Sequence, residues 1–239
     1  MSRKLATVVL FALLLLPLAV ATGITAPADK PVELTADTIE YDSKAGVMTA
    51  EGSVRLVRDK AVLTGANAQY NTKSKEAFIT GNVKMVREDT TLTAAEVRSY
   101  NDNYLVATGN AVLTKGENTL TGPKIEHWVD REYTLVPSSA RMTMPDGWMT
   151  ADKVEAFHKE DRAIAAGSVH IVSEKRDLDA VSDQAVYTGS KTEQGKVVMS
   201  GNARAIQEGN VLTGKTLTIY LDDKAMDAQG KPKLVVKPQ

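Results

Sequence analysis

The chain of 239 residues contains no cysteine, few aromatic residues and almost no net charge. Without cysteine there can be no disulfide, no thiolate metal site and no cysteine nucleophile. Aromatic residues make up 5%, so a hydrophobic core must come mainly from Val, Leu, Ile, Ala and Met. The formal net charge of -1 gives no electrostatic footprint for nucleic acid. We therefore expect no nucleic-acid partner.

The first residues have the composition of a targeting segment. Two basic residues precede an apolar run at residues 5–18, and residues 19–21 form an Ala-Val-Ala triplet typical of signal cleavage. We expect residues 1–21 to be a cleaved signal peptide that exports the chain, and residues 22–31 a short linker. An uncleaved membrane anchor is the alternative, because the run is close to the lower limit for spanning a bilayer.

The rest of the chain repeats. Triplets similar to Leu-Thr-Ala recur with spacings of 29, 29, 28, 29, 29 and 34 residues. Their first residues are Leu34, Leu63, Leu92, Leu120, Met149, Leu178 and Leu212. A glycine follows each triplet at a nearly fixed offset, replaced by serine in the fourth unit. This second marker is Gly52, Gly81, Gly109, Ser138, Gly167, Gly201 and Gly230. Two markers with one period indicate about seven similar units.

Each unit reads as two β-strands. Apolar and polar residues alternate on both sides of the glycine marker, which is typical of strands with one buried face. An aromatic residue followed by a polar turn closes the first strand of each unit. These aromatics are Tyr41, Tyr70, Tyr100, Trp128, Phe157, Tyr187 and Tyr220. The pattern predicts an all-β fold of about seven two-strand units, without a sustained helix.

A column of basic residues lies between the apolar positions that follow the glycine marker. Its members are Arg55, Lys84, Val112, Arg141, His170, Arg204 and Lys233. Period two places this column on the face opposite the apolar one, where it should be solvated. The column could bind phosphate groups or acidic partners. The simpler interpretation, which we favour, is that long cations shield an exposed β face and discourage aggregation.

The elements Leu34-Thr-Ala-Asp and Thr80-Gly-Asn-Val, repeated in order, resemble the OstA-like domain family. The resemblance covers roughly residues 32–236, so we expect one such domain in residues 32–239. It implies a twisted β jelly roll, in which two facing sheets form a V that is open at both ends. It also implies a soluble periplasmic protein that carries lipopolysaccharide toward the outer membrane. The serine of the fourth unit, Pro137 and the turn at residues 144–148 predict a kink or a join between two half-domains.

This resemblance implies an apolar groove for the acyl chains of lipid A. We expect it to be lined by Leu34, Leu56, Leu63, Val83, Met85, Leu92, Leu113, Met142, Val169 and Ile171. The end strands should dock other transport components, through Val32, Leu34 and Ala36 at one end and Leu234 and Val236 at the other. We expect the partners to be lipopolysaccharide, the inner-membrane and outer-membrane components, and further copies of the chain joined head to tail.

Catalysis is not indicated by any motif. The three histidines, His127, His158 and His170, have no spacing typical of metal ligands, and no nucleophile elbow or phosphate-binding loop occurs. We expect no enzyme activity, metal or cofactor. An exported β-solenoid that serves as a structural or adhesin module is the main alternative, and its apolar columns would form a closed core. A polysaccharide-acting enzyme on a β-helix is the third candidate.

Overall fold

The computed structural model describes residues 33–58, 60–101, 103–189, 195–221 and 225–238. The described chain is all-β, as predicted, apart from one 3₁₀ turn, η1 (Glu174–Arg176). It divides into two compact units, of which the first ends at Val136 and the second begins at Pro137. The predicted signal peptide and linker, and Val32 of the predicted N-terminal edge, lie outside the described residues.

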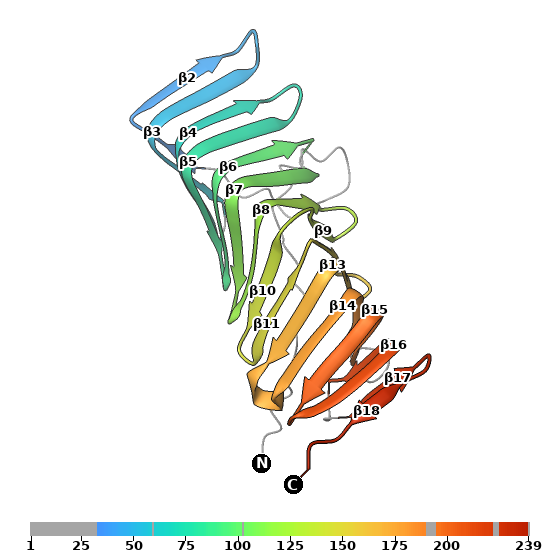
Figure 1. Cartoon of the computed structure of the whole chain (residues 1–239). Helices are drawn as coiled ribbons and strands as arrows, with labels where there is room; N and C mark the ends of the chain where they lie inside the picture. Colours follow the sequence, from blue (N-terminus) through green and yellow to red (C-terminus); the bar gives the residue numbers. More distant parts are fainter. Residues whose placement is uncertain (1–32, 59, 102, 190–194, 222–224, 239) are drawn as a thin grey trace, which may run out of the picture. The chain divides into compact units, whose positions relative to one another are not determined.

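The first unit is a stack of antiparallel hairpins, drawn from blue to green in Figure 1. Two short strands, β1 and β2, both pair with β3, and each later strand pairs with the next one along the chain. The strands are β1 (Glu33–Thr35), β2 (Thr38–Asp42), β3 (Val47–Arg58), β4 (Ala61–Asn71), β5 (Glu76–Arg87), β6 (Thr90–Tyr100), β7 (Tyr104–Lys115), β8 (Asn118–Trp128) and β9 (Tyr133–Val136).

The second unit repeats this plan. Strands β11 and β12 both pair with β13, and the short strands β17 and β18 both pair with β16. The strands are β10 (Ala140–Met144), β11 (Gly147–Ala151), β12 (Lys153–Phe157), β13 (Arg162–Ser173), β14 (Leu178–Thr188), β15 (Lys196–Gln207), β16 (Asn210–Tyr220), β17 (Met226–Gln229) and β18 (Lys233–Val235).

The glycine marker forms a corner inside the long strands. In β3 the pairing register with β4 shifts between Glu51 and Val54, and the two residues between them, Gly52 and Ser53, have φ values of 74° and 50°. Such left-handed backbone is accessible to glycine without the steric cost that a Cβ brings. The same corner recurs at Gly81-Asn82, Gly109-Asn110, Gly167-Ser168 and Gly201-Asn202. Each long strand is therefore divided into two arms.

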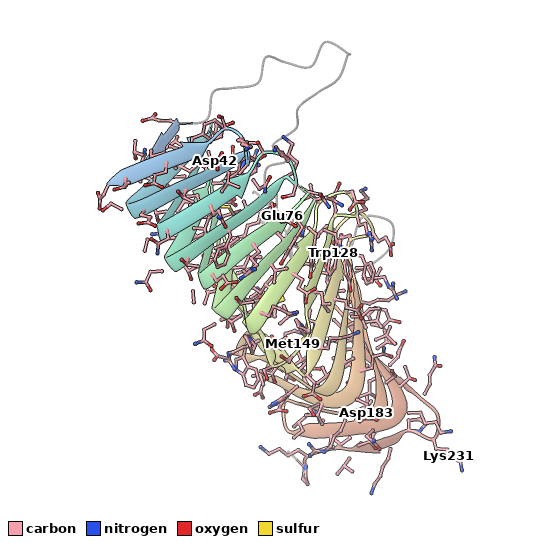
Figure 2. The ribbon with its side chains drawn as sticks, turned by 90° about the horizontal axis from the view of Figure 1, so that it is seen from above. Asp42, Glu76, Trp128, Met149, Asp183 and Lys231 are labelled. Atoms are coloured by element: carbon pink, nitrogen blue, oxygen red, sulfur yellow. The ribbon has the colours of Figure 1, made fainter. Side chains whose placement is uncertain are left out.

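The aspartates that follow the Leu-Thr-Ala triplets lie against these corners. The backbone N–H of Asp37 donates to the carbonyl of Gly52 at 2.9 Å, and that of Asp152 donates to Gly167 at 2.8 Å. The side chain of Asn202 donates to the carboxylate of Asp183, which is labelled in Figure 2, at 2.9 Å. A Cβ on Gly52 would overlap the neighbouring carboxylate. Close approach to the neighbouring strand thus explains why glycine occupies these corners.

The predicted start of the sixth unit is wrong by two residues. Leu178 was expected to align with the leucines of the other triplets, but Ala180 pairs with Ile171 and Ala205, which occupy that column. The register therefore makes Ala180-Val181-Ser182-Asp183 the equivalent of Leu-Thr-Ala-Asp. Leu178 and Asp179 then correspond to Ala61 and Val62, which begin β4 just before Leu63, and η1 precedes them.

The corners define two arms that we name by the residues characteristic of each. The cation arm contains the segments that carry the basic column, such as residues 54–58 of β3 and 61–65 of β4. The aromatic arm contains the segments that end in the aromatic residues, such as residues 47–51 and 67–71. Along each strand of both arms, residues of an inward face alternate with more exposed residues of an outer face. We define the inward face by its buried residues. This arrangement confirms the expected jelly-roll class.

Candidate functional site

A row of apolar residues crosses the inward face of the cation arm in each unit. Strand register joins Leu34, Leu56, Leu63, Met85, Leu92, Leu113 and Leu120 in the first unit. In the second unit it joins Met142, Met149, Ile171, Ala180, Ala205, Leu212 and Leu234. Eight of the ten predicted groove residues belong to these rows. The other two, Val83 and Val169, lie on the same face beside the corners.

A second inward row runs along the aromatic arm, and none of its residues was among the predicted groove residues. It consists of Ile39, Ala50, Ala68, Ile79, Val97, Ala107 and Ile125 in the first unit, and of Val154, Ala165, Ala185, Met199, Leu217 and Ala228 in the second. The alternation of apolar and polar residues before each glycine marker was the sequence signal that could have indicated this row. Each of the two compact units therefore has two apolar rows, one on each arm.

Burial varies along the predicted lining of the first unit. Leu34, Leu56 and Leu63 near the N-terminal end are half-buried, whereas Leu92 and Leu113 further along are 2% and 0% exposed. In the second unit Met142 and Ile171 are half-buried and Val169 is buried. The apolar surface is thus accessible at the start of the first unit and covered by neighbouring side chains in its middle.

The aromatic residues do not form the single column that the sequence suggested. Tyr70 pairs with Ala77 and shares the inward face with Ala68, whereas Tyr100 pairs with Tyr104 on the outer face. The offset from the unit start explains the difference. Tyr70 lies seven residues after Leu63, but Tyr100 lies eight after Leu92, and one residue reverses the face of a strand.

The outer aromatics of the first unit stack across neighbouring strands. Ring centroids are 5.6 Å apart for Tyr100 and Tyr104, 4.6 Å for Tyr104 and Trp128, and 5.2 Å for Trp128 and Tyr133. Figure 2 labels Trp128 at the hairpin end of β8. The first two pairs are stacked and the third is tilted, and we interpret this row of ring contacts as a clamp between strands β6 to β9.

A buried carboxylate lies beside this clamp. Glu126 is 7% exposed, accepts a hydrogen bond from the Tyr104 hydroxyl at 2.6 Å and is ion-paired with Lys124. Burial, with the hydrogen bond to Glu126, raises the pKa of Tyr104 above its ordinary value. On the inward face of the same strand, the Nδ1 atom of the buried His127 lies 3.0 Å from Oγ1 of Thr134.

The basic column lies on the outer face of the cation arm, as predicted. Arg55 stands between Thr35 and Thr64 in register, and Arg204 stands between Val181 and Thr213. The five members with long cationic side chains, Arg55, Lys84, Arg141, Arg204 and Lys233, are all exposed. Threonine or another branched residue separates successive members. This alternation suits a solvated β surface.

The histidines lie in three different surroundings, namely the buried His127, the buried His158, and His170 beside Asp179 at 3.1 Å. Within the described ranges no three or more potential metal-ligating side chains gather in one place. Nor does any helix there have the length and apolar character needed to cross a bilayer.

The two ends of the described chain differ in charge. Residues 33–42 contain four acidic residues and no basic one, whereas residues 230–238 contain three lysines and no acidic residue. Ile39 and Tyr41 are 46% and 58% exposed at the first end. At the second end Leu234 and Val236 are 61% and 63% exposed.

A cavity of about 520 Å³ opens at the C-terminal end. Its lining combines both arms, with Leu212 and Leu234 from the cation arm and Met226 and Ala228 from the aromatic arm. Two of the predicted docking residues, Leu234 and Val236, are among those that line it. The inward apolar rows therefore continue into an accessible hollow at this end.

These features define a repeat-built β protein with two apolar rows, one on each of its bent arms. Residues 24–95 match the family model described as OstA-like protein. Residues 145–225 match the model described as LptA/(LptD N-terminal domain) LPS transport protein. The resemblance expected from the repeats is thus confirmed. No curated protein matches the chain. Among solved structures, the chain is similar to the crystal structure of LptH from Pseudomonas aeruginosa. That protein is described as the LptA homologous periplasmic component of the conserved lipopolysaccharide transport device. The two sequences are 16% identical, the match covers 87% of this chain and 96% of that chain, and the TM-score is 0.23.

Proposed function

We propose that the protein binds lipopolysaccharide through its lipid A acyl chains and carries it across the periplasm toward the outer membrane, as one part of a protein bridge. The paired apolar rows of each unit are the observation that carries this proposal. The two family models support the transport role, since one of them is named for lipopolysaccharide transport.

The energy available from such a surface is sufficient without polar recognition. Burying one methylene group is worth about 0.8 kcal/mol, so an acyl chain of about a dozen carbons gains on the order of 10 kcal/mol. The rows consist of Ala, Val, Leu, Ile and Met, whose side chains leave room for an aliphatic ligand and can adapt to it. The half-buried lining near Leu34 and Leu56 is where we place the first contact with lipid.

Edge strands at both ends supply the contacts of the bridge. Strands β1 and β2 pair only with β3 among the described residues, and β17 and β18 pair there only with β16. We propose that β18 of one copy adds to β1 of the next, head to tail, so that the apolar rows continue from copy to copy. The acidic first end and the lysine-rich second end are complementary in charge. The same edges would receive the inner-membrane and outer-membrane components.

Charge reversal tests this docking. We expect the double variant Lys233→Glu and Lys237→Glu to lose the concentration-dependent association of the purified protein in sedimentation experiments. Adding Glu33→Lys and Glu40→Lys to the same chain should restore it. Association that is insensitive to both changes and to salt would rule out the proposed end-to-end contact.

A closed structural module is the second candidate, and the complete burial of Leu113 in the middle of the row favours it. Photocrosslinking separates the two. We would place the crosslinking residue at Leu56, Met85 or Met142, with the exposed Arg55 as the control, and add lipopolysaccharide. Crosslinks at the inward positions but not at Arg55 are expected. A folded protein that crosslinks at none of them has a closed core and does not carry lipid there.

A further inference from the structure

The sixth repeat unit, which begins near Ala180, departs from the other repeats at both of its hairpin ends. At the tip of the cation arm, η1 makes the connection between β13 and β14 four residues long, whereas two residues join β5 to β6. At the tip of the aromatic arm, the longer segment that follows Thr188 separates β14 from β15. Neither addition is needed for the inward rows, which run through this unit without interruption. The departure therefore requires another explanation.

Arg176, the last residue of η1, is anchored at the tip of the cation arm. Its carbonyl accepts a hydrogen bond from Nε2 of Gln207 at 3.2 Å. The next residue, Asp177, accepts a hydrogen bond from the backbone N–H of Glu208 at 3.2 Å. Gln207 itself is buried and pairs with Asn210 at the start of β16.

The guanidinium group of Arg176 reaches the opposite arm. Its Nη1 atom donates to the carbonyl of Tyr220 at 2.8 Å. Asn210 and Tyr220 are the two ends of β16, and a straight strand of that length would separate them by about 33 Å. Because one arginine side chain spans the gap, β16 must bend along with the corner of its neighbour β15, which brings the two tips close together. The contact joins the tips of the two arms.

Apolar residues lie on the inward face beside this contact. Leu178 is 4% exposed and Ile219 is 2% exposed, and they belong to the cation arm and the aromatic arm respectively. Next to Tyr220, the backbone N–H of Leu221 donates to the carbonyl of Gly195 at 2.8 Å, which fastens the lengthened tip to β16. Gly195, just before β15, therefore lies beside the residue that follows Tyr220, the partner of Arg176.

We propose that Arg176 is a gate across the open side of the second unit, closed in the lipid-free protein and opened when an acyl chain passes sideways between the arms. This proposal rests on the proposed function, because it assumes that lipid uses this space. A hydrogen bond from a charged donor to a backbone carbonyl is strong enough to hold two arms together and weak enough to break during transport.

Distance measurements test the gate directly. The chain has no cysteine, so Glu174→Cys and Thr188→Cys place one spin label on each tip without further changes. We expect a short, narrow distance distribution in lipid-free protein, and a longer and broader one after Arg176→Ala. The matched control is Lys175→Ala, which removes a neighbouring cation whose partner, Asp146 at 3.6 Å, lies on the same arm. The control should leave the distribution unchanged.

Adding lipopolysaccharide provides the second part of the experiment. Lipopolysaccharide should lengthen the distance in the labelled protein that retains Arg176, and Arg176→Ala should accelerate uptake about tenfold, as expected for losing a hydrogen bond to a charged group. An unchanged distance in folded Arg176→Ala overturns the gate. Tips that stay closed while Leu56 crosslinks to lipid also overturn it, although transport would stand. If no inward position crosslinks, the proposed function fails, and the lipid-free comparison still decides whether Arg176 holds the tips.

Discussion

The corner glycines should be far more sensitive to substitution than glycines in turns, and Gly109 allows the cost to be worked out. Its φ value is 81°, and an added Cβ would overlap the Cβ of Ala95 on β6. Left-handed backbone costs a residue with a Cβ roughly 1–2 kcal/mol. Overpacking at a fixed contact adds typically 1–3 kcal/mol. We therefore expect Gly109→Ala to lower the free energy of unfolding by about 2–5 kcal/mol.

Gly116 is the matched control, because its φ value is 55° and no atom lies within 4 Å of the position of its Cβ. Gly116→Ala should cost only the backbone part, roughly 1–2 kcal/mol. Urea denaturation followed by circular dichroism measures both. The double variant with Ala95→Gly should recover the overlap part, with a coupling energy of about 1–3 kcal/mol. A coupling near zero, or equal costs at Gly109 and Gly116, would refute the close approach at the corner.

Further predictions concern buried groups and the C-terminal edge. Tyr104→Phe should lower the free energy of unfolding by about 1–3 kcal/mol, because it leaves the buried Glu126 carboxylate without its hydroxyl donor, and thermal unfolding measures the loss. Burial raises the pKa of Tyr187 to about 12, so its neutral form is stabilised in the folded state. The stabilisation should be complete below the ordinary value of about 10 and be lost as the pH rises toward 12. Ultraviolet titration should show late tyrosines, one of which Tyr187→Phe removes. Leu113→Ala should cost about 2–5 kcal/mol in urea denaturation, whereas Leu234→Ala should leave stability nearly unchanged and weaken self-association. Equal stability losses at these two leucines would contradict the burial described.

The repeat and the faces of the strands could be predicted because they depend only on local patterns. Period two separates Arg55 from Val54 and Leu56, and the structure places Arg55 on the outer face and the other two on the inward face. The glycine marker predicts a special backbone position, although a marker alone does not tell that it is a corner within a strand. The role of Asp37 against Gly52 needs the register between β2 and β3.

Other features could not be predicted because they depend on how segments distant in the sequence pair. The sixth unit was misaligned because Leu178 fits the leucine column by residue type, while Ala180 occupies it in register. The aromatic residues were grouped by chemistry, yet a difference of one residue in offset separates Tyr70 from Tyr100. The sequence gives the residue types, but strand register decides which column and which face each residue occupies.

A repeat protein built from equal units offers the same surface at every step, which suits a cargo that must slide but gives no reason for the cargo to leave at a given place. A device that acts at one place therefore has to be built where the repeat is broken. The sixth unit is broken at both tips, and the break on the cation arm carries Arg176, which is bonded to Tyr220 on the opposite arm. If the additional residues served only to connect strands, shortening the connection at residues 174–177 would change neither arm separation nor lipid uptake. We expect it to change both, because the shortened chain would keep its apolar rows but would no longer carry Arg176 to the opposite arm.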